Sequence, residues 1–119
     1  MDVTQALKDT ENALRDFITL ILSRELGPDW IANCGVSADR LQKWENRRNE
    51  DVRKQNTGIV EERLIYYADF YDLKTILKKH WQHFSVALGN WKTIEVYMSE
   101  LAKLRDPDAH RRELLILKC

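Results

Sequence analysis

Hydrophobic residues near the start of the chain recur every three or four positions, as they do on one face of an α-helix. These residues are Val3, Leu7, Leu14, Phe17, Ile18, Ile21 and Leu22. The pattern predicts a first helix over residues 4–26, ended by Gly27-Pro28 because neither residue continues a helix well. Trp30 and Ile31 follow closely, and we expect them to close that end of the core.

A second helix is predicted over residues 38–54, with Ser37 as its N-cap. Its other positions are mostly charged, and its few apolar residues are Leu41, Trp44 and Val52. Such a helix buries only a narrow stripe of its surface. Asn56-Thr57-Gly58 then predicts a turn. The apolar run over residues 59–67 has irregular spacing, which is compatible with either helix or extended chain.

The second half of the chain opens with a helix-start signal. Asp69 is predicted to be an N-cap, and Asp72 stands where the acidic partner of a capping box belongs. Apolar residues at helical spacing then continue as far as Gly89-Asn90: Phe70, Leu73, Ile76, Leu77, Trp81, Phe84 and Leu88. Further helices are predicted over residues 91–104 and from near Pro107 onward. The pattern indicates an all-α fold, an up-and-down bundle of four to five helices, in a single domain over residues 1–119.

Composition and charge limit the partners and the cellular location expected for this bundle. Lysine and arginine balance aspartate and glutamate at 19 each, so no global field attracts nucleic acid or anionic lipid, and any such binding needs a local patch. Cys34 and Cys119 form neither a disulfide framework nor a C-x-x-C metal motif, and we expect two free thiols. The polar N-terminus is unlike a secretory signal and no apolar run is long enough for a membrane span. These features predict a cytoplasmic protein without membrane contact.

One segment near the C-terminus carries the residue types needed for chemistry on a phosphate. Asp106 followed by Pro107 is a common helix start, with the aspartate as N-cap. Arg105 precedes that start and His110 falls in its first turn. A guanidinium can hold a phosphate through two hydrogen bonds, and an imidazole can move a proton near neutral pH. Together they could cleave RNA without a metal ion.

Arg105-Asp106-x-x-x-His110 resembles the R-x(4–6)-H signature of HEPN domains, in which a polar residue often follows the arginine. The wider stretches Tyr67-Ala-Asp-Phe-Tyr-Asp-Leu73 and Leu104-Arg-Asp-Pro-Asp-Ala-His-Arg-Arg-Glu-Leu114 are similar to the HEPN branch attached to larger RNA-processing or defence proteins. The similarity covers the C-terminal half well and the first helix loosely, and residues 35–56 match no family pattern.

The resemblance implies a homodimeric, metal-independent endoribonuclease that needs no cofactor and acts in toxin or anti-phage defence. Two copies of the Arg/His pair would share one cleft, with RNA as substrate. Arg105 would stabilise the scissile phosphate, His110 would be the general acid or base, and Asp106 would cap the helix and orient its neighbours. Arg111 and Arg112 flank the histidine, and we expect them to contact RNA.

Two departures from the family pattern keep other functions open. Arg112 stands where one toxin subgroup has tyrosine, and Asp106 stands where many relatives have asparagine, so a carboxylate would lie beside the phosphate. The first alternative is a non-catalytic HEPN-like module for dimerisation, nucleotide sensing or partner docking. The second is a helical adaptor unrelated to HEPN domains. The chain stops at Cys119 in an apolar stretch, from which we expect a partner domain or a longer parent protein.

Several other residues have both a functional and a plainer interpretation. His80 and His83 have a spacing that zinc ligands can use, but no further ligands lie nearby in sequence, which favours a polar helix face and no metal. Basic residues on two predicted helices form either an RNA-binding rim or a solvated face: Lys74, Lys78 and Lys79 with Arg47, Arg48, Arg53 and Lys54. Among the tryptophans that could stack on bases, Trp81 is predicted to be core and Trp44 to be the most exposed.

Overall fold

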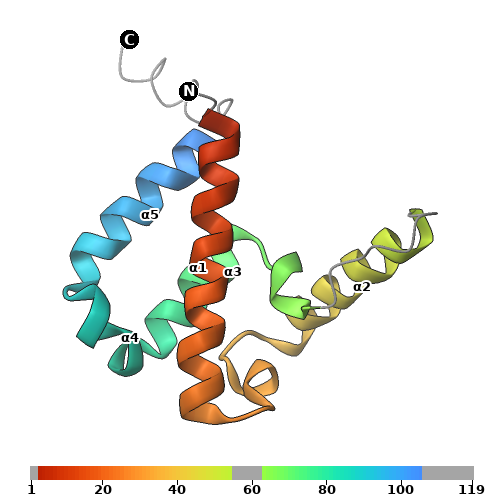
Figure 1. Cartoon of the computed structure of the whole chain (residues 1–119), viewed down its shortest axis with the longest axis horizontal. Helices are drawn as coiled ribbons and strands as arrows, with labels where there is room; N and C mark the ends of the chain where they lie inside the picture. The colour runs from red at the N-terminus through yellow and green to blue at the C-terminus, as the bar shows by residue number, and fades with distance from the viewer. Residues whose placement is uncertain (1–2, 55–62, 106–119) are drawn as a thin grey trace.

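The described residues fold into a series of helices (Figure 1). A computed structural model describes residues 3–54 and 63–105. The elements in chain order are α1 (Val3–Leu26), the 3₁₀-helix η1 (Trp30–Asn33), α2 (Ala38–Lys54), the 3₁₀-helix η2 (Leu64–Tyr67), α3 (Phe70–Lys79), α4 (Trp81–Leu88) and α5 (Trp91–Arg105). Within the described ranges every regular element is helical, which confirms the predicted all-α class.

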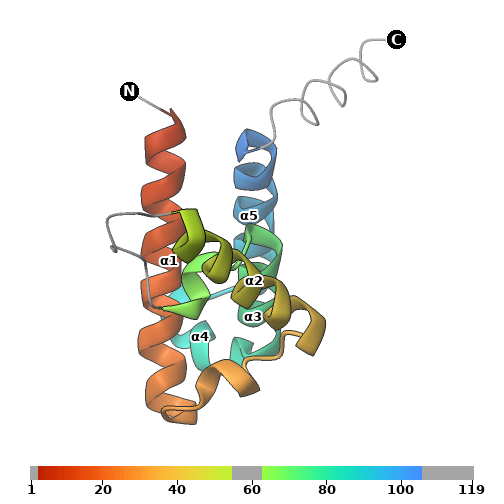
Figure 2. The same cartoon turned by 90° about the vertical axis from the view of Figure 1, so that its right-hand side faces the viewer.

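Helices α1 and α5 run antiparallel, so the start of α1 lies near the end of α5 (Figures 1 and 2). The apolar stripe of α1 faces a core that α3, α4 and α5 complete, and Phe17 of α1 packs its ring 5.7 Å from that of Phe84 in α4. The buried apolar residues are Ile18, Ile21, Leu22, Trp30, Cys34, Trp44, Ile65, Ala68, Phe70, Leu73, Ile76, Leu77, Phe84 and Met98. In the described part of the chain, no helix combines the length and the apolar character that a membrane crossing requires.

The predicted helix over residues 69–88 is wrong in one respect, because it breaks into two at His80. The backbone of His80 has φ −112° and ψ 29°, and its imidazole Nε2 lies 3.1 Å from the carbonyl oxygen of Asn33. The apolar pattern does not reveal the break, since Leu77 before it and Phe84 after it both reach the same core. Gly89, with φ 83°, follows α4 at the predicted position.

Helix α2 lies to one side of the other helices (Figure 1) and contacts η2 most extensively. The prediction that Trp44 is the most exposed tryptophan is wrong, because its side chain is fully buried. Its indole Nε1–H donates a 2.7 Å hydrogen bond to a carboxylate oxygen of Asp72 on α3. The burial of Trp44 therefore rests on a polar partner 28 residues away, which a local count of charged neighbours does not reveal.

The start of α3 forms the predicted capping box and also receives an arginine from α2. The Asp69 carboxylate accepts from the Asp72 amide at 2.9 Å, and the Asp72 carboxylate accepts from the Asp69 amide at 3.4 Å. Arg40 donates to Asp72 through Nε and to Asp69 through Nη2, both at 2.8 Å. We call Arg40, Trp44, Asp69 and Asp72 the α2–α3 clamp.

Removing the indole N–H from the clamp should destabilise the whole domain. In Trp44→Phe the Asp72 carboxylate stays buried with one donor fewer, so the free energy of unfolding should fall by about 2–3 kcal/mol. Urea titration followed by circular dichroism measures this loss. Trp91→Phe is the matched control, because the Trp91 indole is only partly buried and its ring contact with Trp81 can survive. Equal losses in the two variants would contradict the role of the hydrogen bond.

The clamp should also make the free energy of unfolding depend on pH in the acidic range. Partial burial raises the pKa of Asp69, but the Asp72 amide and the Arg40 guanidinium outweigh this and hold that pKa below its ordinary value. The ionised carboxylate therefore stabilises the fold above the ordinary value of roughly 3.9, and this contribution disappears as the pH falls through the lower folded-state pKa. Urea midpoints measured from neutral to acidic pH should fall less steeply in Arg40→Gln, whereas the exposed Arg53→Gln should follow the parent curve.

Candidate active site

Arg105, the first residue of the motif, is the last described residue of α5. The helix is oriented by its inner face, where Met98 is buried and Trp91, Ile94 and Leu101 pack against the core. This packing carries the end of α5 to the side of the first turns of α1 (Figure 1). Of the other predicted site residues, Asp106, His110, Arg111 and Arg112 lie outside the described residues.

The surface leading to Arg105 carries charges of both signs. On α5, Lys103 lies 3.8 Å from Glu100, and on α1 the amide of Gln5 donates to Asp9 at 2.9 Å. Lys8 of α1 is exposed. The affinity for an anion bound beside Arg105 would therefore come more from the motif than from the neighbouring surfaces of α1 and α5.

Helix α1 carries a buried polar cluster that its apolar pattern alone does not predict. Arg15 and Glu11 are each only 8% exposed, and their charged groups lie 3.5 Å apart. The Arg15 guanidinium donates to the Ala68 carbonyl at 2.8 Å and to the Asn12 side chain at 2.9 Å, and it lies 5.6 Å from the ring centre of Tyr66. This arginine therefore holds the segment that leads into α3 against α1.

A signal for that cluster was present in the helical periodicity. Glu11 and Arg15 occupy the same face of α1 as Leu7, Ile18 and Leu22, where an apolar residue would ordinarily stand. Charged residues four apart on a buried stripe indicate an internal ion pair, since isolated buried charges are costly. The distant acceptor, the carbonyl of Ala68, could be found only from the folded chain.

His80 and His83, whose spacing zinc ligands can use, lie where α3 meets α4. Their rings stack with centroids 6.1 Å apart, and His83 Nδ1 lies 3.9 Å from a carboxylate oxygen of Glu25. In the described ranges no group of three or more potential ligands could hold a metal ion. Of the tryptophans considered for base stacking, Trp44 is buried, and Trp81 makes a T-shaped contact with Trp91, with ring centroids 5.3 Å apart.

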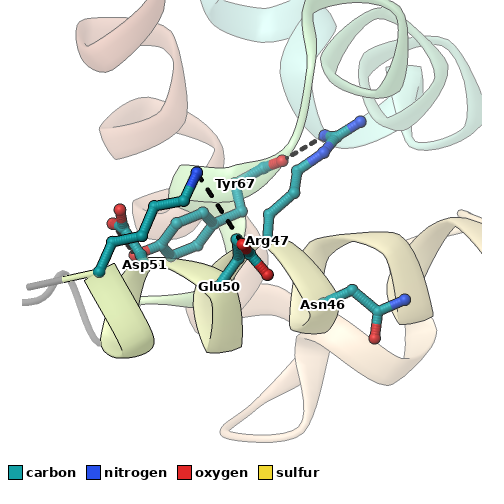
Figure 3. Close-up of a pocket in the computed structure, with 6 residues that line it drawn as sticks. Asn46, Arg47, Glu50, Asp51 and Tyr67 are labelled. Atoms are coloured by element: carbon teal, nitrogen blue, oxygen red, sulfur yellow. Dashed lines mark hydrogen bonds and ion pairs between the residues drawn. The ribbon is translucent and has the colours of Figure 1, made fainter.

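A shallow hollow of about 460 Å³ lies between α2 and η2 (Figure 3). Its polar groups are occupied by one another: Arg47 donates to the Tyr67 carbonyl at 2.7 Å, the Tyr67 hydroxyl donates to Asp51 at 2.9 Å, and Lys54 lies 3.9 Å from Glu50. The two cations and two carboxylates leave the lining without net charge. The described part of the hollow therefore offers a weak site for an anionic ligand.

Cys34, which follows η1, is buried and is a free cysteine. Burial raises the pKa of its thiol above the ordinary value, although backbone hydrogen bonds act in the opposite direction. A protonated, inaccessible thiol is a poor nucleophile. The second predicted thiol, Cys119, lies outside the described residues.

Comparison with known families supports the resemblance that the motif indicates. The family described as Swt1-like HEPN matches residues 5–115, including the stretch from 35 to 56 for which the sequence alone indicated no relationship. Neither the curated proteins nor the solved structures include a significant match to the chain. Because the family match extends over nearly the whole helical domain, the chain belongs to the Swt1-like HEPN family.

Proposed function

We propose that this domain is a metal-independent endoribonuclease whose site is built on Arg105 and His110. The observation that carries the proposal is the motif Arg105-Asp106-x-x-x-His110, which begins at the last described residue of α5 in a chain of the HEPN family. HEPN membership suggests an RNase-type domain, and the motif supplies a phosphate-binding cation and a proton-transfer group. The biological setting we propose is toxin or anti-phage defence in the cytoplasm.

The chemistry follows from the two side chains and the RNA itself. The ribose 2′-oxygen attacks phosphorus, and the bond from phosphorus to the 5′-oxygen of the next nucleotide breaks, which leaves a 2′,3′-cyclic phosphate. His110 accepts the 2′-hydroxyl proton or donates a proton to the departing 5′-oxygen. Arg105 binds the phosphate oxygens, whose negative charge grows in the transition state. Asp106 caps the helix start, and Arg111 and Arg112 contact neighbouring phosphates.

The proposed active form is a homodimer in which two Arg/His pairs face one cleft. One protomer offers a single pair near a helix end, whereas two protomers could exclude water and strengthen the electrostatic interactions. The outward face of α5 supports this arrangement, because Tyr97 and Leu104, two turns apart on that face, are 62% and 51% exposed. This strip, which also carries the exposed Glu100, leads toward Arg105 and can be covered by a second copy.

A non-catalytic module for dimerisation, nucleotide sensing or docking to an attached domain is the second candidate. The observation that favours it is the acidic pair Asp106 and Asp108 inside the motif, which would repel a phosphate. Such a module would bind its partner or nucleotide with no turnover of RNA, so a cleavage assay separates the two functions.

Cleavage of labelled structured and single-stranded RNA in EDTA tests the first proposal. The parent protein should cut RNA, and His110→Ala should lower the rate about 100-fold or more because proton transfer is lost. His83→Ala, a histidine outside the motif, is the matched control and should retain the parent rate. Cleavage that persists in His110→Ala would refute the assignment, and absence of cleavage by every protein would support the non-catalytic module.

The dimer can be tested through the exposed strip on α5. Charge introduced by Tyr97→Glu together with Leu104→Glu should dissociate the dimer and abolish cleavage while the helical circular dichroism spectrum stays unchanged. Leu20→Glu, at a 62% exposed residue of α1, is the control and should change neither property. Sedimentation velocity gives the oligomeric state. A doubly substituted monomer that cleaves at the parent rate would show that one copy suffices.

A further inference from the structure

The balanced net charge of the chain conceals a strong local separation of charge. Residues 73–94 contain no aspartate or glutamate but four lysines, namely Lys74, Lys78, Lys79 and Lys92. Since the chain has 19 basic and 19 acidic residues, the remainder has 15 against 19 and a net charge of −4. The basic stretch includes most of α3, all of α4 and the first turn of α5.

The fold leaves Lys78 and Lys79 of α3 exposed and Lys74 partly exposed. Tyr71, Lys74 and Lys78 are three and four residues apart, so they share one face of the helix. Tyr71 is 69% exposed and Lys78 is exposed, whereas Asp72, the single acid of α3, is only 2% exposed and faces Trp44. We call Tyr71, Lys74 and Lys78 the α3 face.

The charges of the α3 face are not neutralised by neighbouring acids. In the described part of the chain, Lys74 and Lys78 have no carboxylate partner, in contrast to Lys54 and Lys103, which pair with glutamates on their own helices. Asp69, the acid that caps α3, is held by Arg40 at 2.8 Å and lies 3.9 Å from Arg47. Lys79, beside the face, donates to the Gly35 carbonyl at 2.6 Å and adds a fixed positive charge.

Tyr71 gives the face a flat aromatic surface as well as charge. The Arg40 guanidinium carbon lies 5.5 Å from the centre of the Tyr71 ring, and two aspartates of the clamp hold that arginine in place. The ring is therefore restrained by a cation while most of it remains accessible. Lysines that bind phosphates, next to an aromatic ring on which a base can stack, form the usual combination for single-stranded nucleic acid.

We propose that the α3 face is a second RNA-binding surface, which holds a single-stranded part of the substrate away from the Arg105/His110 site. Lys74 and Lys78 contact phosphates and Tyr71 stacks on a base. This inference rests on the proposed ribonuclease function for the identity of the nucleic acid, but it concerns binding through different residues. It explains how a chain without net charge could retain RNA, since the attraction is concentrated on one face.

Binding and cleavage are measured separately so that each proposal can fail alone. The binding protein is the His110→Ala chain, and the probe is a short, unstructured, fluorescently labelled RNA in EDTA, followed by anisotropy at about 50 and about 200 mM salt. In this background Lys74→Glu with Lys78→Glu should weaken binding about tenfold or more and reduce the salt dependence. Lys8→Glu with Lys43→Glu, exposed lysines of α1 and α2, is the matched control and should bind like its parent.

Tyr71→Ala distinguishes the stacking surface from charge alone. It should weaken binding of the single strand about fivefold or more while leaving the salt dependence and the affinity for duplex RNA unchanged. Equal weakening by the α3 and control lysine pairs would overturn the proposal, because it would show non-specific attraction. Unchanged RNA binding with lost binding to polyglutamate would overturn it in favour of an acidic protein partner. If the parent cleaves RNA but the α3 variants bind RNA as the His110→Ala chain does, the proposed binding surface is refuted. The proposed ribonuclease function would still stand.

Discussion

The arrangement of the helices depends most on the hydrogen bonds that the buried carboxylate of Asp72 accepts. A carboxylate that is 2% exposed is tolerated only when its oxygens accept hydrogen bonds, and here the side-chain donors are the indole of Trp44 and the guanidinium of Arg40. Both donors come from α2, while the carboxylate also belongs to the capping box of α3. One acidic residue therefore starts a helix, buries a tryptophan and attaches the helix that lies apart from the others.

A second internal polar group supports the connection between the clamp and α1. Arg15 reaches from α1 to the carbonyl of Ala68, just before the residue that caps α3. The start of α3 is thus held from two sides, by α1 through Arg15 and by α2 through Arg40. With α3 fixed, α4 and α5 follow through the core, and α5 returns antiparallel to α1 with Arg105 at its last described position. The motif therefore begins on α5, and the direction of α5 is set by core packing far from the motif.

We propose two surfaces of this domain as RNA contacts, and they would act for different reasons. The Arg105/His110 motif would act on one phosphate through chemistry that requires a fixed cation and a titrating imidazole. The α3 face would act through an aromatic ring and through lysines without a carboxylate partner among the described residues, and these groups would hold a strand without cutting it. If the α3 face binds the strand, the Arg105/His110 site does not have to supply all of the affinity for RNA. The site could then tolerate the negative charge of Asp106.

The sequence by itself determined the features that depend on neighbouring residues. Gly27-Pro28, Ser37, the pair Asp69 and Asp72, and Gly89 mark helix boundaries through backbone conformation and capping, which are local, and the structure has boundaries at these positions. The motif from Arg105 to His110 likewise identified the HEPN family without any coordinates, because its meaning lies in residue types and spacing.

The tertiary structure alone decided which partners allow polar groups to lie inside. Trp44 stands among charged neighbours and is buried, because its partner Asp72 arrives from another helix. Glu11 and Arg15 are buried because the Ala68 carbonyl comes to them across 53 residues. The break at His80 is hidden in the sequence, since both halves keep their apolar side toward one core. Each of these three features depends on a contact between segments that are distant in the sequence. The energy of such a contact cannot be inferred from the residue pattern of either segment alone.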